Sequence, residues 1–209
     1  MKDDLIQAIS DLEEETALQI VNQKLKAGET PLEIVEQCRQ GVEIVGKKYS
    51  EEVYYLSDLI MSEEILRRIM ETLEPSFTRK ARQNGTKIVM GTIEGDIHDL
   101  GKNIIINLLR SHGFDVYDLG VDVEPREFIE AIKETDAKIL GISVLLTFSI
   151  SAVKKVIDLL YETGLRKKVT VLLGGYPTNE RIRQFTGADY CETDAIRAVE
   201  LFKAIALSR

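Results

Sequence analysis

The chain of 209 residues has few cysteines and no long apolar run, and both shortages limit what it can be. Its two cysteines, Cys38 and Cys191, match no paired metal-ligand spacing, so neither a disulfide framework nor a zinc knuckle is predicted. No apolar run approaches the roughly 20 residues that a membrane-spanning helix needs, and the first residues lack the apolar core of a signal peptide. We therefore expect a soluble protein in the reducing cytoplasm, with no membrane partner.

Positive charge is also scarce. The 27 Lys and Arg residues stand against 35 Asp and Glu residues, which gives a formal net charge of -8. Proteins attract nucleic acid nonspecifically by neutralising its phosphates with Lys and Arg, so this balance argues against a nucleic-acid partner. The hydrophobic fraction of 44% and the charged fraction of 30% are typical of soluble globular domains and argue against wholesale disorder.

Residues 1–74 carry apolar side chains at the three- and four-residue spacing that is typical of helices. One run ends at Gly28. A second helix is predicted to begin at Thr30, which is followed by a proline and, three residues on, by a glutamate, a capping-box signal. With a further helix from about Ser57, the pattern predicts an antiparallel helical bundle over residues 1–80. The buried stripe expected for the second helix is Leu32, Val35, Cys38, Val42 and Val45.

The segment 75–85 loses this periodicity and ends in Asn-Gly, a turn signal, so we place a domain boundary here. Beyond it, short runs rich in β-branched residues alternate with amphipathic stretches. This alternation predicts parallel strands joined by crossover helices, a Rossmann-like (flavodoxin-like) domain over residues 86–209. The expected class is therefore α + α/β, a helical bundle followed by a parallel sheet. The predicted strands are 87–92, 115–119, 138–144 and 169–173, and the predicted helices are 103–111, 125–135, 151–163 and 193–207, the last capped by Thr193.

In an open α/β sheet, ligands bind where loops leave the carboxyl ends of the strands, so the loop after the first predicted strand is the leading candidate for a site. It reads Ile-Glu-Gly-Asp-Ile-His-Asp-Leu-Gly-Lys-Asn over residues 93–103. A Walker A loop has four residues between its glycine and Gly-Lys, whereas five separate Gly95 from Gly101. A G-x-G-x-x-G dinucleotide fingerprint is absent, and the carboxylates of the loop would repel a phosphate.

What this loop does contain is a histidine with a carboxylate two residues before it. Side chains at i and i+2 of an extended segment project to the same side, so Asp96 can accept a hydrogen bond from one ring nitrogen of His98. That bond fixes the tautomer and leaves the other nitrogen free to bind a metal. Taken alone, a loop histidine is more often structural or solvated, and that interpretation stays open here. Zinc sites take three or four protein ligands, but one imidazole suffices where a macrocycle supplies the other donors.

The longer pattern Gly-Asp-Ile-His-Asp-Leu-Gly-Lys-Asn, residues 95–103, resembles the signature loop of cobalamin-binding domains in the methionine synthase and methyltransferase corrinoid-protein family. Two further segments are similar to that family and follow in the right order: Ser-Val-Leu-Leu-Thr-Phe-Ser at 143–149 and the glycine pair at 174–175. In the N-terminal half, residues 54–61 resemble the helix that covers the corrin in such carriers. The chain departs from the family pattern at Tyr176, where a small residue is usual.

The resemblance implies a corrinoid protein that holds cobalamin, as methylcobalamin or a related corrinoid. His98 would be the metal ligand, replacing the cofactor's own base below the cobalt, the base-off, His-on arrangement. Asp96 would hold the far ring nitrogen and Ser149 would extend this relay toward solvent, so that proton uptake accompanies loss of the axial ligand. Tyr55 and Met61 would shield the upper corrin face. The candidate catalytic residues are thus Asp96, His98 and Ser149, and the implied cofactor contacts are Gly95, Asp96, Ile97, His98, Asp99, Gly101, Ser143, Leu145, Thr147, Gly174, Gly175, Tyr55 and Met61.

The same resemblance implies a slot beside the sheet for the displaced nucleotide tail of the cofactor. Gly101 and the glycine pair at 174–175 would line it, because small residues let a bulky group approach the backbone. Ser143 and Thr147 would offer hydroxyl groups to the tail, and Leu145 would pack against it.

The implied partners are enzymes. A substrate-specific methyltransferase would load the cofactor from a methylamine, methanol, betaine or aryl ether, and an acceptor methyltransferase would unload it. A reductive activation protein would restore the cofactor. The chain itself would be a non-catalytic carrier subunit, because no part of it is long enough for a catalytic barrel of about 250 residues.

Three other classes share parts of this pattern. A cobalamin-dependent sensor or regulator normally adds a DNA-binding or signalling module, and the acidic charge also argues against it. A mutase subunit fits less well, because the loop that includes Lys102 and Asn103 resembles the methyltransferase branch more than the mutases. The helical N-terminal half also argues against a mutase. A phosphoryl-accepting receiver domain needs an aspartate at the end of the third strand, where Val144 and Leu145 stand. The methyl carrier is therefore favoured, and the sensor is the alternative.

Overall fold

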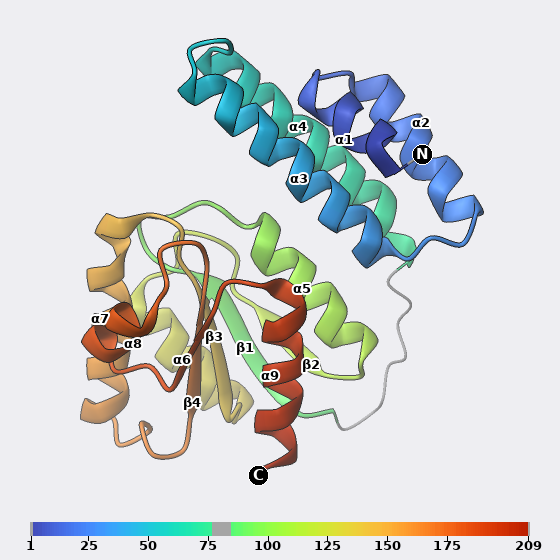
Figure 1. Ribbon diagram of the computed structural model, residues 1–209. Helices are drawn as coiled ribbons and strands as arrows, with labels where there is room; N and C mark the ends of the chain where they lie inside the picture. Colours follow the sequence, from blue (N-terminus) through green and yellow to red (C-terminus); the bar gives the residue numbers. More distant parts are fainter. Residues whose placement is uncertain (1, 77–84, 209) are drawn as a thin grey trace. The chain divides into compact units, whose positions relative to one another are not determined.

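A computed structural model describes residues 2–76 and 85–208, which belong to two compact units (Figure 1). We call residues 1–78 the helical unit and residues 79–209 the sheet unit. Most of the expected boundary segment, residues 77–84, lies outside the described residues, so the exact boundary stays a prediction. Within the described ranges, no helix is long and apolar enough to cross a membrane.

The described part of the helical unit consists of α-helices and one short 3-10 turn. The elements are α1 (Lys2–Ser10), α2 (Glu14–Lys26), α3 (Pro31–Ser50), α4 (Leu56–Leu73) and η1 (Glu74–Ser76). Helix α3 packs against both α1 and α4, and α2 packs against α1 and α4 (Figure 1). The start of α3 is as predicted: the Thr30 hydroxyl accepts the Glu33 N–H at 3.4 Å, and the Glu33 carboxylate accepts the Thr30 N–H at 2.9 Å.

The first apolar run is divided, although the sequence pattern predicts that it continues to Gly28. It breaks at Leu12, whose φ of 61° lies in the left-handed region. Leucine rarely adopts this conformation, so the residue type gives no sign of the break. The Leu12 N–H donates to the Ile9 carbonyl at 3.0 Å, which closes α1 with a tight turn.

The buried face of α3 is rotated relative to the predicted stripe. Leu32, Val35 and Val42 are only half-buried. Ile9 of α1 approaches α3 so closely that a Cβ on Gly41 would come within 2.8 Å of its Cβ atom. The missing side chain at Gly41 therefore decides which face of α3 meets α1. The buried residues of α3 are Ile34, Gln37, Cys38, Gly41 and Val45.

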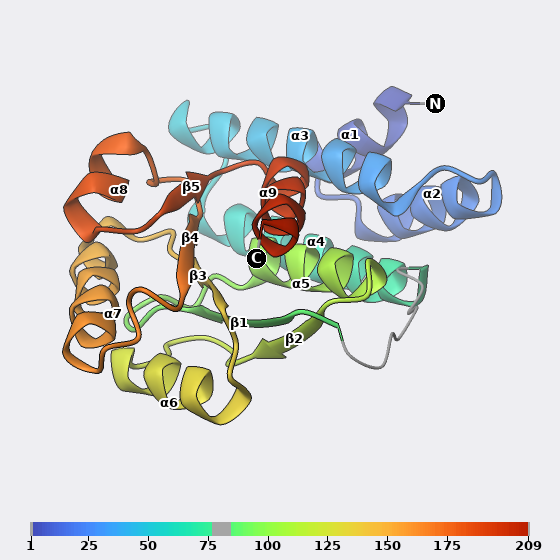
Figure 2. The same ribbon diagram turned by 90° about the horizontal axis from the view of Figure 1, so that it is seen from below.

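The described strands of the sheet unit form one parallel sheet in the order β2-β1-β3-β4-β5. Helices α5 and α9 cover one face, and α6 and α7 cover the other (Figure 2). The predicted class, a helical bundle followed by a parallel sheet, is confirmed. The strands are β1 (Lys87–Thr92), β2 (Asp115–Asp118), β3 (Ile139–Ser143), β4 (Thr170–Gly174) and β5 (Tyr190–Glu192). The helices are α5 (Leu100–Ser111), α6 (Pro125–Thr135), α7 (Ile150–Glu162), α8 (Glu180–Thr186) and α9 (Ala195–Leu207), with a 3-10 turn η2 at Thr147–Ser149.

The central strands β1, β3 and β4 are apolar and buried along most of their length, as expected for strands that helices cover on both faces. The four predicted strands agree with β1 to β4 to within one residue at each end. The sequence pattern did not predict β5 or α8, which are only three and seven residues long. The predicted cap of the last helix is wrong. Asp194 caps α9 in place of Thr193, because its carboxylate stands directly before the helix and accepts the Arg197 N–H at 2.8 Å.

Strands β1 and β3 are neighbours, but the chain leaves them toward opposite faces of the sheet. The loop after β1 leads to α5, and the loop after β3 leads to α7 on the other face (Figure 2). A crevice between diverging loops at the carboxyl ends of the strands is where doubly wound sheets bind their ligands. The Ile93 N–H donates to the Ser143 carbonyl at 3.1 Å, so the two loops begin in contact.

Substitutions in the turn after β4 test how closely the loops pack at this edge of the sheet. Gly175 has a φ of +113°, and a Cβ there would overlap the carbonyl oxygen of Val144. We expect Gly175→Ala to lower the free energy of unfolding by about 3 kcal/mol, measured by urea denaturation. Gly174→Ala is the matched control, because its Cβ would meet nothing closer than the Glu192 carbonyl oxygen at 3.8 Å. We expect it to change stability by less than about 1 kcal/mol, and equal losses for the two variants would contradict this account.

Candidate functional site

The loop between β1 and α5 is folded onto itself at the carboxyl edge of the sheet. Gly95 has a φ of +81°, and the Asp96 N–H donates to the Ile93 carbonyl at 3.1 Å, which makes a tight turn. The Thr92 hydroxyl donates to the His98 carbonyl at 3.1 Å. These bonds hold both ends of the turn against β1, so its side chains have defined positions.

The carboxylate of Asp96 is completely buried and joins two loops. Its Oδ1 atom lies 2.7 Å from Nδ1 of His98 and accepts the His98 N–H at 3.1 Å. Its Oδ2 atom accepts the N–H groups of Leu145 and Leu146, at 2.5 and 3.0 Å, from the loop after β3. The hydrogen bond expected between Asp96 and His98 is therefore present. The two amides were not anticipated, because no side-chain pattern marks a backbone donor.

Asp96 is ionised at neutral pH. Burial by itself would raise the pKa of this carboxyl group, but the hydrogen bonds from Leu145, His98 and Leu146 outweigh burial and hold the pKa below its ordinary value. A carboxylate carries no proton, so Nδ1 of His98 must be the donor in their hydrogen bond. Nε2 then has a free lone pair, and it makes no hydrogen bond to any other described residue. The His98 side chain is 44% exposed, so this nitrogen is open to a ligand.

Large apolar side chains stand exposed at the same edge. Ile97 is 70% exposed and Phe148 is 71% exposed, and Leu145 and Val121 are each 39% exposed. They come from the loops after β1, β2 and β3, and Tyr176 after β4 is also exposed. Exposed apolar groups that gather at one place mark a surface that binds a partner or a ligand. Sequence reasoning named Ile97 and Leu145 but missed Phe148 and Val121, whose only signal is that they lie between a strand and the α-helix that follows it.

A narrow cavity of about 100 Å³ lies between the sheet and helices α5 and α9. It brings together four of the residues predicted for the nucleotide slot: Gly101, Ser143, Gly174 and Gly175. A Cβ on Gly101 would meet no atom within 4 Å, which leaves open space at the start of α5. Leu145 and Thr147, predicted for the same slot, do not line it. Lining residues that sequence reasoning missed are Met90, Lys102, Ile105, Gly141, Ile142, Leu172, Glu192, Thr193, Ala195 and Phe202.

The remaining predicted residues are placed as follows. The Ser149 hydroxyl is buried next to Gly95 and makes no hydrogen bond, so it does not contact Asp96 here. Asp99 precedes α5 and accepts the Asn103 side-chain amide at 3.0 Å. Thr147 is exposed at the start of η2. Tyr55 and Met61 belong to the helical unit, are 74% and 46% exposed, and keep their cap role as a prediction.

Lys102 is a charged group that the resemblance named without a role. It is 2% exposed and its ammonium group donates to Asp118 at 2.7 Å and to the Asn103 side-chain oxygen at 2.8 Å. The same Asp118 oxygen accepts the Gly120 N–H at 3.0 Å. Lys102 therefore ties the first turn of α5 to the end of β2, beside the cavity.

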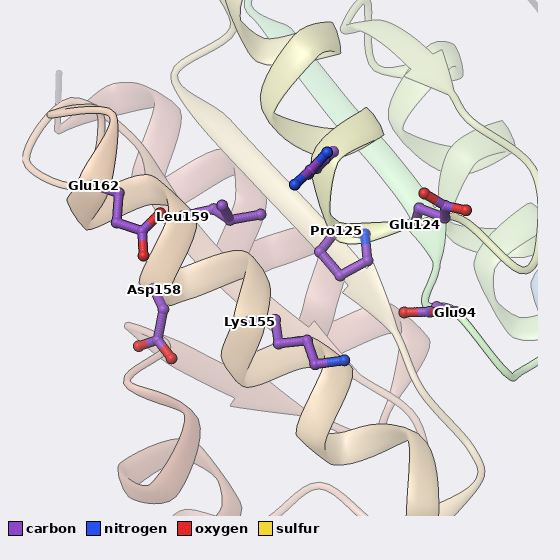
Figure 3. Close-up of a pocket in the computed structure, with 8 residues that line it drawn as sticks. Glu94, Glu124, Pro125, Lys155, Asp158, Leu159 and Glu162 are labelled. Atoms are coloured by element: carbon purple, nitrogen blue, oxygen red, sulfur yellow. The ribbon is translucent and has the colours of Figure 1, made fainter.

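A second cavity of about 390 Å³ lies on the opposite face, between the start of α6 and the middle of α7 (Figure 3). Its lining combines both signs of charge, and Figure 3 shows Lys155 on α7 and Pro125 at the start of α6. None of the residues predicted for the site lines this cavity. Its lining residues are Glu94, Glu124, Pro125, Arg126, Lys155, Asp158, Leu159 and Glu162.

The geometry fits a large, mostly apolar ring with a metal at its centre. The available metal ligand is a single imidazole on a side chain that is 44% exposed, which suits a metal whose other ligands come from a macrocycle. Among the described residues there is no group of three or more His, Cys, Asp and Glu side chains that could hold a metal ion. The exposed apolar residues flank the imidazole loop, and the narrow cavity offers room for a side arm of the ring. Fold and site together define a doubly wound sheet whose switch point suits a macrocyclic metal cofactor.

Comparison with known families identifies this cofactor. A B12 binding domain family matches residues 86–202, and a second family of the same description matches residues 1–74. The chain therefore belongs to the B12-binding family, and its cofactor is a corrinoid.

Relatives match along nearly the whole chain. Dimethylamine corrinoid protein 3 of Methanosarcina acetivorans is 37% identical over 96% of this chain and 94% of its own length. A corrinoid protein of Desulfitobacterium hafniense is 37% identical over 97% of this chain and 96% of its own length. The solved monomethylamine corrinoid protein of Methanosarcina barkeri is 28% identical, with a TM-score of 0.87 over 96% of both chains. A chain of the methanol:cobalamin methyltransferase complex from that organism is 27% identical, with a TM-score of 0.57 over 99% of this chain and 79% of that one. The protein is accordingly a cobalamin-binding corrinoid protein.

The buried carboxylate leads to a pH-dependent prediction. Folding lowers the pKa of Asp96, so the ionised carboxylate stabilises the folded chain. This stabilisation is complete above the ordinary pKa of 3.8 and is lost as the pH falls through the lower pKa of the folded chain. We expect Asp96→Asn to lower the free energy of unfolding by about 2 kcal/mol at neutral pH, measured by urea denaturation. This difference from the wild type should shrink below about pH 4. Asp99→Asn, at an exposed carboxylate of the same loop, should show a much smaller loss. A loss for Asp96→Asn that is independent of pH would refute the account.

Proposed function

We propose that this protein carries a methyl group on its corrinoid between two methyltransferases. The names of its relatives, dimethylamine and monomethylamine corrinoid proteins, support a methylamine as the source of the methyl group. The relative within a methanol:cobalamin methyltransferase complex supports docking to a methyltransferase. When bound, the corrinoid supplies the cobalt that accepts and releases the methyl group. An acceptor methyltransferase and a reductive activation protein complete the proposed set of partners, and the cytoplasm is the proposed location.

The observation that carries the proposal is the pairing of His98 with Asp96. We infer that Nε2 of His98 is the lower ligand of the metal, in the base-off, His-on arrangement. The Asp96 carboxylate fixes the tautomer through the hydrogen bond at Nδ1, which leaves the lone pair on Nε2. The amides of Leu145 and Leu146 hold the carboxylate itself in place. The imidazole is thus oriented by a chain of hydrogen bonds that reaches into both loops of the switch point.

The same pair can take up a proton. When Nε2 has no metal partner, it is the atom of the pair at which a proton is added, because both oxygens of Asp96 already accept hydrogen bonds. Nε2 belongs to a side chain that is 44% exposed, so the proton can arrive directly from solvent. Ser149, the proposed outer member of the relay, has a buried hydroxyl group that is free to accept or donate one hydrogen bond.

The narrow cavity is the proposed slot for the nucleotide tail. Gly101 opens it at the start of α5, and the Ser143 hydroxyl stands at its wall. Gly174 pairs with Ser143 across the neighbouring strands β3 and β4, and Gly175 follows it, so the wall next to Ser143 is bare backbone. We assign Leu145 and Thr147 to the rim, outside the slot.

His98→Ala tests the metal ligand. We expect the wild-type chain, loaded with corrinoid, to show the absorption spectrum of an imidazole-ligated cobalt, and the variant to lose that spectrum. Affinity for the corrinoid should fall by at least about tenfold, measured by spectrophotometric titration. His112→Ala is the matched control, because His112 ends α5 and its Nδ1 atom lies 2.8 Å from the Leu108 carbonyl oxygen. If His98→Ala and His112→Ala give the same spectrum, His98 is not the ligand.

Methyl transfer tests the function itself. The corrinoid-loaded chain is mixed with a methylamine:corrinoid methyltransferase and its methylamine, and the spectrum is followed with time. We expect the protein-bound corrinoid to become methylated, and a thiol-specific methyltransferase to remove the methyl group again. Free corrinoid at the same concentration is the control. A protein-bound corrinoid that is never methylated by methylamine, methanol, betaine or aryl ether systems would exclude the carrier function.

A further inference from the structure

Asp122, in the loop between β2 and α6, has an unusual backbone conformation. Its φ of 53° lies in the left-handed region, which costs a residue with a side chain about 1 kcal/mol or more. Such conformations persist where surrounding contacts demand them. The start of α6 does not require it, because Glu124 is the cap of that helix and forms a capping box with Glu127.

The contacts of Asp122 are with the loop that carries His98. Its own N–H donates to the Asp96 carbonyl at 3.0 Å, and its carboxylate accepts the Gly95 N–H at 2.7 Å. The left-handed conformation lets the N–H and the side chain of one residue reach two consecutive residues of the neighbouring loop. One bond holds the Gly95 N–H and the other holds the Asp96 carbonyl, so together they fix the position and the orientation of the backbone from Gly95 to Asp96.

The two segments stay paired on either side of this contact. The Glu94 N–H donates to the Val123 carbonyl at 2.9 Å, and the Val123 N–H donates to the Thr92 carbonyl at 3.0 Å. Ile93 and Val123 form a parallel bridge that extends the sheet by one step. Figure 3 shows the neighbouring side chains of Glu94 and Glu124, one from each segment. Asp122 is therefore the last contact of this pairing, at the point where the chain turns toward His98.

We propose that Asp122 is a positioning residue for the metal ligand. It holds the Gly95 N–H and the Asp96 carbonyl, the backbone groups on either side of the peptide that joins these two residues, and so places the Asp96 carboxylate where it meets His98 on one side and the amides after β3 on the other. This inference rests on the proposed role of His98. Asp122 acts through Asp96, and among the described contacts its bonds go to the backbone of the loop. The β2–α6 loop thereby becomes part of the cofactor site.

The test separates the side chain of Asp122 from its backbone strain. Asp122→Gly keeps the left-handed conformation without strain but removes the carboxylate. Asp122→Asn also tolerates this conformation, and its amide oxygen can still accept the Gly95 N–H. Asp136→Gly is the matched control, because Asp136 has a φ of 57° at the end of α6 and its carboxylate pairs with Lys138.

Two readings are taken on each variant. The first is hydrogen exchange of the Gly95 amide in the cofactor-free chain, followed by NMR. The second is the rate at which loaded corrinoid is released, together with its absorption spectrum. For Asp122→Gly we expect both rates to rise roughly tenfold, with no fall in the thermal midpoint beyond that of Asp136→Gly. Asp122→Asn should restore both rates to within about threefold of the wild type.

The outcomes distinguish the inference from the function on which it rests. If Asp122→Gly shows the same Gly95 exchange rate and the same corrinoid release rate as Asp136→Gly, the positioning role is wrong. This holds even if His98→Ala abolishes the imidazole spectrum. A fall in thermal midpoint that Asp122→Asn does not rescue would overturn it too, since it would show a structural role alone. If His98→Ala keeps the imidazole spectrum, the proposed function itself fails, whatever the Asp122 variants show.

Discussion

One buried carboxylate organises the site. Asp96 is removed from water entirely, and a buried charge is tolerated only where hydrogen bonds replace its hydration. Its four bonds come from the loop after β1 and from the loop after β3, which belong to neighbouring strands but lead to opposite faces of the sheet. The carboxylate is therefore satisfied only when both strands are in register. Assembly of the sheet and orientation of the imidazole follow from a single constraint.

Features that depend on nearby residues could be predicted from the sequence. The bond between Asp96 and His98 joins residues two apart, the cap at Thr30 spans three residues, and β1 to β4 follow from short apolar runs. Features that depend on backbone groups far apart in the sequence could not be predicted. The Leu145 N–H stands 49 positions from Asp96, and no side chain marks it as a donor. Asp122 was missed for the same reason, because its role depends on a backbone conformation and on a partner in another loop.

Packing geometry accounts for the remaining differences. The break at Leu12 and the rotation of α3 at Gly41 both depend on how closely α1 approaches its neighbour, which an apolar pattern alone does not specify. The glycine pair after β4 illustrates the same limit. Its two members are alike in sequence, yet only Gly175 meets the backbone of another loop. Residue type indicates that a close approach is possible, and the fold decides where it takes place.

The ion pair of Lys102 and Asp118 has a consequence for how the cofactor enters. A lone lysine at the wall of the cavity would attract the phosphodiester of a corrinoid tail from a distance, as an ammonium ion attracts any anion. Here a carboxylate at 2.7 Å already neutralises the cation, and Glu192 adds a further carboxylate to the lining, so the cavity does not attract an approaching anion by its charge. In the proposed slot, entry of the tail would then depend on shape and on desolvation, and only weakly on ionic strength.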